Sequence, residues 1–360
     1  ISFFPVPYPD ELFYSICARY ADRIGFSVFR SAALHIFGKE IRSVNIYFPS
    51  QIPDFIERLP PNDLCTFDYI VNNHTVIPFY SVFVSSEDAL NIKSALKNNE
   101  SNKGFSWLRS LQGTYGKRLF LRYCPICVST DRIEYGETYW HRLHQIPDIE
   151  ICPIHGCYLI DSSAPLKEFN QISVADRFIS TSLNPQYCDA SKQVVQQQLA
   201  LATDTAWILE NWETLPNIYA AMGHVFAIVD KDLLGEMVSQ YQFSGDENQP
   251  EHRRRRKLKK FDSPFHFLVL LNTVGLSFAE FVGKLEVDGQ LPEDLAVVFR
   301  NLVDSIGYID VRGAHSPNKM QYKHLEFSEK KEKYRADFLA ILQKEPQATK
   351  VQLREKYGHL

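Results

Sequence analysis

The chain has 360 residues, which is too long for one ordinary hydrophobic core, so we expect two or three domains. Hydrophobic residues make up 45% and charged residues 23%, and no run approaches the ~20 apolar residues of a membrane span. The net charge of −4 hides one local bias, because HRRRRKLKK at 252–260 carries seven positive charges. Any contact with nucleic acid would therefore be confined to particular surfaces.

Two helices are predicted close to the N-terminus. An apolar stripe recurs at steps of three and four residues, and its members are Leu12, Phe13, Ile16, Tyr20 and Ile24. Gly25 should end this helix, Ser27 should cap a second one, and Gly38 should end that. Such a pair has the layout of a helix-turn-helix, although a plain helical hairpin fits the same spacing and is common.

Further helices follow along the chain. Residues 45–115 read as mainly helical, with breaks at prolines and a capped helix beginning at Ser86. The stretch 191–211 predicts an amphipathic helix, and 263–285 predicts two packed helices that are split near Gly275, with Ser277 as a cap. The predicted fold is mainly α and multi-domain, with helix-turn-helix units and a small zinc-finger module.

The composition suggests five segments. We expect an N-terminal helical or helix-turn-helix domain (1–115), a zinc-finger module (116–165), a helical region with a linker (166–250) and a second helical domain (251–325). Residues 326–360 predict the start of a C-terminal helix-turn-helix DNA-binding domain. Because a recognition helix would come immediately after the helix that ends near Gly358, we expect the natural protein to continue beyond Leu360.

The strongest chemical signal is a pair of closely spaced ligand motifs. Cys124 and Cys127 form a CxxC, and Cys152 and His155 form a CxxH, with 24 residues between the pairs. Thiolate and imidazole are ligands that Zn²⁺ prefers, and four of them fill a tetrahedral site and leave no position for water. The pattern therefore predicts structural Zn²⁺ rather than catalytic zinc.

Other residues of the same segment compete for the ligand roles. His141 and His144 are spaced HxxH, and Cys157 lies two residues beyond His155. The simplest interpretation puts both histidines on a helix between the two pairs, as packing or supporting residues, and makes Cys157 a small buried residue.

Enzyme signatures are lacking in the sequence. HExxH and GxSxG do not occur, and GTYGKR at 113–118 is too short for a phosphate-binding loop. Nucleobase deaminases have a PCxxC after an upstream HxE, whereas the only HxE of this chain, at His324, lies far downstream of its CxxC. We expect a protein that is not an enzyme. The chain also opens without a charged start and an apolar signal core, so we expect it to be cytoplasmic, with no membrane partner.

Basic residues near the cysteines suggest contact with double-stranded DNA. The candidate phosphate contacts are Lys117, Arg118, Arg122, Arg142, Arg253, Arg254, Arg255, Arg256, Lys257, Lys350 and Arg354. Basic residues that merely decorate a zinc module, and a basic linker that is merely solvated, remain alternatives.

Several motifs in this order resemble the TniQ/TnsD family of bacterial transposon target-selection proteins. They are FPVPYPDELFYSICARY at 4–20, HTVIPFYSVF at 74–83, the cysteine-rich segment at 122–160 and, more weakly, the helical stretch from Ser263. The resemblance covers most of residues 3–165, and the opening motif points to the TnsD branch.

The resemblance implies a non-enzymatic adaptor in the bacterial cytoplasm, associated with the nucleoid. Such adaptors bind a target DNA site or, alternatively, dock on an RNA-guided Cascade-like complex. They recruit the AAA+ ATPase TnsC, a heptameric or filament-forming protein, which licenses the transposase subunits. It also implies that Cys124, Cys127, Cys152 and His155 are the zinc ligands. The DNA-reading residues of the family vary, so none is carried over to this chain.

Overall fold

The computed structural model describes most of the first 313 residues. The described ranges are 4–41, 44–60, 65–100, 119–166, 172–180, 183–229, 234, 263–286 and 289–313, with side chains of the last range described as far as 305. These residues are mostly helical, as predicted, and their only sheet has two strands. Residues 1–300 form one compact unit, and residues 301–360 form another.

The first two helices occur where the sequence predicts them. They are α1 (Phe13–Arg23) and α2 (Phe29–Phe37), and they contact each other. We use the name α1–α2 hairpin for these two helices and the turn between them, residues 13–37. Gly25 and Gly38 both adopt positive φ angles at the helix ends, +83° and +71°. Ser27 is not the cap of α2, because Val28 occupies that position and makes no side-chain cap. The helix-turn-helix units remain a prediction.

The next helices are short, and proline sets where two of them begin. They are α3 (Ile52–Ile56), α4 (Phe67–His74), α5 (Ile77–Ser81) and α6 (Ser86–Lys97). Pro53 and Pro78 lie in the first turns of α3 and α5, where a missing backbone N–H costs nothing. Ser85 caps α6 by accepting a hydrogen bond from the backbone N–H of Asp88 at 3.1 Å.

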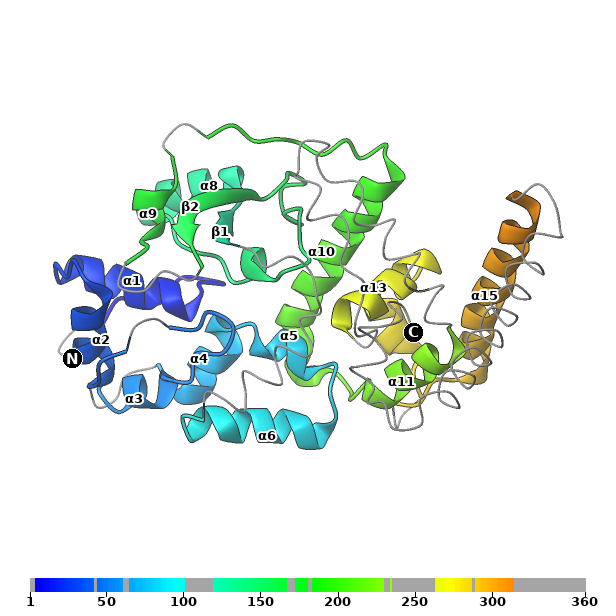
Figure 1. Ribbon diagram of the computed structural model, residues 1–360, viewed down its shortest axis with the longest axis horizontal. Coiled ribbons are helices and arrows are strands. Elements are labelled where there is room, and N and C mark those ends of the chain that lie inside the picture. Colours follow the sequence, from blue (N-terminus) through cyan, green and yellow to red (C-terminus); the bar gives the residue numbers. More distant parts are fainter. Residues whose placement is uncertain are drawn as a thin grey trace, which may run out of the picture. The chain divides into compact units, whose positions relative to one another are not determined.

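The cysteine-rich segment contains the sheet. Strands β1 (Phe120–Tyr123) and β2 (Ile160–Pro165) pair antiparallel, with Arg122 opposite Asp161. Between them lie α8 (Pro125–Tyr135) and the 3-10 helix η1 (Leu143–Gln145), and α9 (Ala175–Phe178) packs on β2. Figure 1 shows these elements together beside α1.

The second half of the described chain is helical. It contains α10 (Gln193–Asn211), the 3-10 helix η2 (Trp212–Thr214), α11 (Tyr219–Ile228), α13 (Pro264–Thr273), α14 (Phe278–Lys284) and α15 (Glu293–Gly313). Helix α10 packs on α5, α13 and α14. The predicted split near Gly275 is confirmed, and Ser277 forms a capping box with Glu280. No single described helix is long and apolar enough to cross a bilayer; α13 and α14 reach that length and composition only together, across an 86° bend.

The N-terminal helices and the cysteine-rich segment are joined by buried hydrogen bonds. The backbone N–H of Leu12 donates to the carbonyl of Trp140 at 2.9 Å, and the backbone N–H of Trp140 donates to the Ser15 hydroxyl at 3.1 Å. The Trp140 indole N–H donates to the carbonyl of Ser173 at 2.7 Å. The predicted domain boundaries at 115, 165, 250 and 325 remain predictions, and residues 326–360 lie outside the described part.

Candidate metal centre

The first ligand pair lies where β1 runs into α8. Cys124 is the N-cap of α8, and its Sγ accepts the backbone N–H of Cys127 at 3.4 Å. Pro125 follows in the first turn, where its fixed φ suits a helix start. One helical turn therefore directs both thiols to the same side.

The second pair lies in a tight turn before β2. The backbone N–H of Cys152 donates to the carbonyl of Cys157 at 2.9 Å, and the N–H of Gly156 donates to the carbonyl of Cys152 at 2.9 Å. Gly156 adopts a φ of +58°, a conformation that glycine reaches without strain. Strand β1 ends at the first ligand pair and β2 begins after the second. The pairing of the two strands therefore brings the two turns together.

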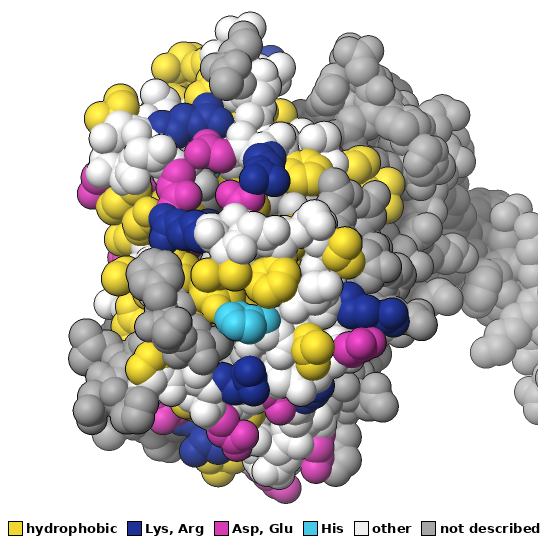
Figure 2. Space-filling view, turned by 90° about the vertical axis from the view of Figure 1, so that its left-hand side faces the viewer, with side chains coloured by type: hydrophobic (Ala, Val, Ile, Leu, Met, Phe, Trp, Pro, Cys, Tyr) yellow, Lys and Arg dark blue, Asp and Glu magenta, His cyan; other side chains and the backbone are white. Residues whose placement is uncertain are grey.

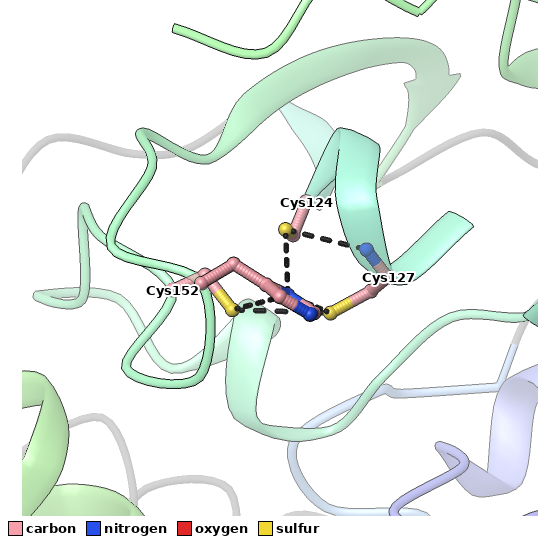
Figure 3. Close-up of side chains that lie close together, drawn as sticks. Cys124, Cys127 and Cys152 are labelled. Carbon is pink, nitrogen blue, oxygen red and sulfur yellow. Dashed lines mark hydrogen bonds between the residues drawn. The ribbon is translucent and has the colours of Figure 1, made fainter. Parts of the chain in front are cut away.

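The four ligand atoms lie within 4.8 Å of one another. The His155 Nδ1 lies 3.5 Å from the Sγ of Cys124, 3.3 Å from that of Cys127 and 3.6 Å from that of Cys152. The sulfurs of Cys127 and Cys152 are 3.8 Å apart. Figure 3 shows the three thiols converging on one point.

The three sulfur–nitrogen separations and the Cys127–Cys152 separation fit one tetrahedral ion. Bond lengths of about 2.3 Å to sulfur and about 2.0 Å to nitrogen give tetrahedral edges of about 3.8 Å between sulfurs and about 3.5 Å between sulfur and nitrogen. The three cysteines are buried and His155 is half-buried. The sulfur-rich donor set suits Zn²⁺, which would be held by four protein ligands and would hold the two turns together.

Without a metal ion, the thiols would have to share protons. Hydrogen bonds from Cys127, Cys152 and Cys157 lower the pKa of the Cys124 thiol. The same contact with Cys124, together with burial, raises the pKa of Cys127. A divalent cation removes this conflict, because its charge stabilises all the thiolates together.

The segment between the pairs differs from the expected helix. Residues 138–140 are not helical, His141 bridges to Glu11, and only Leu143–Gln145 forms a helical turn. The His141 ring hydrogen-bonds Asp131 at 3.0 Å, away from the thiols, so this histidine is a supporting residue. The His144 Nε2 lies 3.9 Å from the Sγ of Cys127, at the border of the ligand cluster.

Gln145 and Arg122 hold the segment against β1. The backbone N–H of Arg122 donates to the Gln145 Oε1 at 3.0 Å, and the Gln145 amide donates to the carbonyl of Arg122 at 2.8 Å. The Arg122 guanidinium donates to the carbonyls of His144 at 3.0 Å and Ile146 at 3.1 Å. Arg122 is only 1% exposed. The guanidinium therefore binds backbone carbonyls in the interior beside the metal centre, and a DNA phosphate does not reach it in this structure.

Arg142 has a similar interior role. It is 7% exposed, and its guanidinium contacts the Asp10 carboxylate at 2.9 Å and the carbonyls of Asn72 at 2.6 Å and Thr75 at 3.2 Å. The side chain ties the metal segment to the N-terminal helices. The remaining DNA-contact candidates lie outside the described residues: Lys117, Arg118, Arg253, Arg254, Arg255, Arg256, Lys257, Lys350 and Arg354.

The sequence analysis missed a buried charge network behind the centre. The Arg19 guanidinium contacts the Glu11 carboxylate at 2.7 Å and the Glu137 carboxylate at 2.9 Å, and Arg19 and Glu11 are 2% and 0% exposed. Burial raises the pKa of Glu11 to about 7, although Arg19 opposes the shift. The spacing of the two residues in the sequence does not predict this contact, because Glu11 lies before α1 and forms a bridge with His141.

Comparison with known proteins identifies relatives of the N-terminal half. Residues 2–159 match the model of the TniQ family. The chain is 26% identical over 153 residues to the Transposon Tn7 transposition protein TnsD of Escherichia coli. The matched segment is 42% of this chain and 30% of that protein, so this chain spans less than a third of its relative.

Proposed function

Residues 2–159 form a TniQ-family domain, and from that premise we propose that the protein is a target-selection adaptor of a transposition system. The observation that carries the proposal is the similarity to a transposition protein over a segment of 153 residues. The proposed adaptor binds target DNA and recruits a AAA+ ATPase of the TnsC kind, which in turn engages the transposase. Its metal centre is proposed to hold structural Zn²⁺.

A non-enzymatic role agrees with the metal site. The cluster of Cys124, Cys127, Cys152 and His155 supplies four protein ligands, and a zinc ion that activates water needs an open position. Within the described residues, no other group of three or more His, Cys, Asp and Glu side chains has a metal-binding arrangement. The centre is therefore proposed to support the fold, while function depends on the surfaces around it.

We assign DNA contact to residues outside the described part. Among the residues that the structure describes, several exposed cations have carboxylate partners, as in the pairs Arg23–Glu137, Arg30–Glu40, Lys93–Asp68 and Arg177–Asp22. Arg122 and Arg142 are buried. The basic run at 253–257 and the C-terminal residues Lys350 and Arg354 are therefore the stronger candidates for phosphate contact.

The described surface is better suited to a protein partner. Figure 2 shows one face on which Lys and Arg side chains are interspersed with Asp and Glu, and hydrophobic side chains gather beside a histidine. The α1–α2 hairpin exposes Ile24 (48%), Val28 (43%) and Leu34 (50%). Mixed charge around exposed apolar side chains is typical of protein interfaces, whereas a DNA-binding face carries an excess of cations. We propose this hairpin as the surface that meets the ATPase.

A selection experiment tests the DNA part of the proposal. The purified, zinc-loaded chain is incubated with a library of fragments from the host genome, and the retained fragments are sequenced. We expect enrichment of a defined site and weaker binding at higher salt, because phosphate contacts release counterions. A chain in which Arg253–Lys257 are changed to Gln is the matched variant, and it should retain less DNA. Equal recovery of all fragments would refute site recognition. The alternative, docking on an RNA-guided complex, is supported by no particular contact.

A further inference from the structure

The metal centre contains one thiol more than a tetrahedral ion needs. The Sγ of Cys157 lies 3.3 Å from the Sγ of Cys124, and Cys157 is 0% exposed. Two sulfurs bound to the same Zn²⁺ lie about 3.8 Å apart. The Cys157 sulfur is therefore closer to the Cys124 sulfur than two ligands at separate corners of the coordination tetrahedron would be. It lies beside the corner that Cys124 occupies.

The backbone holds Cys157 in this place independently of its thiol. Its carbonyl accepts the N–H of Cys152 at 2.9 Å, and Cys157 forms an isolated antiparallel bridge with Tyr187. The flanking N–H of Tyr158 donates to the carbonyl of Gln186 at 3.0 Å. The turn that positions the second ligand pair thus also places a fourth sulfur, and so a fifth donor, at the edge of the cluster.

The five sulfur and nitrogen donors are not equivalent in their surroundings. Cys124 has a thiol neighbour from outside the ligand set, namely Cys157. Cys127 has the imidazole of His144 at 3.9 Å. The Cys152 Sγ lies 3.8 Å from the Sγ of Cys127 and 3.6 Å from the Nδ1 of His155, both of which belong to the set itself. Loss of Cys124 and loss of Cys152 should therefore have different consequences.

We propose that Cys157 is a reserve ligand that takes the corner of Cys124 when Cys124 is lost. A thiolate then replaces a thiolate, so the donor set remains three cysteines and one histidine and the charge around the ion is unchanged. Cys152 has no such replacement among the described side chains. This inference concerns the metal centre alone and does not depend on the target-selection role.

Four variants of the full chain test the proposal: Cys157→Ala, Cys124→Ser, Cys152→Ser and the double variant Cys124→Ser with Cys157→Ala. Serine at 124 keeps an oxygen that can accept the N–H of Cys127 and cap α8. Each protein is dialysed against a mild chelator, and its zinc is measured by mass spectrometry. The thiolate ligands are counted from the sulfur-to-metal charge-transfer absorption of the cobalt-substituted protein.

We expect Cys157→Ala and Cys124→Ser to keep the ion with the absorption of three thiolates. Cys152→Ser and the double variant should lose the ion. Loss of zinc from Cys124→Ser to the same degree as from Cys152→Ser would overturn the proposal, and so would retention of zinc by the double variant.

A second measurement uses the unaltered chain and remains decisive if Cys124→Ser fails to fold. The zinc-loaded chain is treated with a limiting amount of the azo oxidant diamide, which takes up two electrons from two neighbouring sulfurs and two protons, one from the Cys157 thiol and one from water, as a disulfide forms and the ion is released. Peptide mapping should then find Cys124 joined to Cys157. A predominant link between Cys127 and Cys152 would contradict the shared corner.

Discussion

Replacing Arg122 with Met separates an interior role of this residue from a DNA-contact role. Methionine keeps much of the apolar stem and removes the guanidinium, so the carbonyls of His144 and Ile146 lose their charged donor. Hydrogen bonds to a charged group contribute about 1.5–3 kcal/mol each, so the two together give a loss of about 3–6 kcal/mol. The bond to Glu150 adds little to this sum, because that carboxylate is 48% exposed.

Urea unfolding of the zinc-saturated protein measures this loss, with Arg132→Met as the matched control. Arg132 lies on α8 and pairs with Asp176 at 2.8 Å, but the two side chains are 25% and 35% exposed. Such a pair contributes about 0–1 kcal/mol. If Arg122→Met lost no more stability than Arg132→Met, and lost DNA affinity instead, the interior assignment of Arg122 would be refuted.

Three further predictions concern metal, pH and capping. Removal of zinc by a strong chelator, or the change Cys152→Ser, should unfold the segment between β1 and β2, since the ion joins the two turns. Hydrogen exchange of the backbone amides should then rise in that segment, and unchanged protection from exchange would exclude a structural role of the ion. Burial lowers the pKa of His74 to about 4, whereas an unfolded chain titrates near 6.5. The stability that this neutral histidine contributes is present above pH 6.5 and is lost towards pH 4. Between pH 7 and pH 4, the unfolding free energy of the wild type should therefore fall by about 3 kcal/mol relative to that of His74→Gln. A difference between the two proteins that stays constant with pH would contradict this. Ser277→Ala removes the capping box of α14 and should cost about 1 kcal/mol in thermal unfolding, with Ser191→Ala, outside any helix, as a near-neutral control.

Local sequence signals predicted the helix ends well. Gly38 and Ser277 act through their own backbone and side chain, so their roles can be read without knowing the rest of the fold. The ligand spacing was equally readable, because one turn of chain fixes each pair. The pairing of β1 with β2, in contrast, joins residues about 40 positions apart in the sequence, such as Arg122 and Asp161, and no local signal specifies it.

The roles of the residues around the metal centre were harder to predict, because their hydrogen-bond partners are largely backbone groups. Arg122 is held largely by backbone carbonyls, which any sequence provides, so a basic residue beside a cysteine pair was interpreted as a surface cation. The stretch from Thr138 to Trp140 is not helical, and it packs against the residues at the start of α1, as the Leu12–Trp140 hydrogen bond shows. That tertiary contact overrides the helical preference of the segment.

If the chain is an adaptor, it has to bridge the target DNA and the ATPase. Beads that carry the selected target DNA are incubated with a AAA+ ATPase of the TnsC kind from the same host, with ATP, and with or without the zinc-loaded chain. We predict that the ATPase is retained on the beads only when the chain is present, and that a charged substitution at Leu34 on the α1–α2 hairpin abolishes retention while the chain itself stays bound to DNA. Equal retention of the ATPase without the chain would contradict the account.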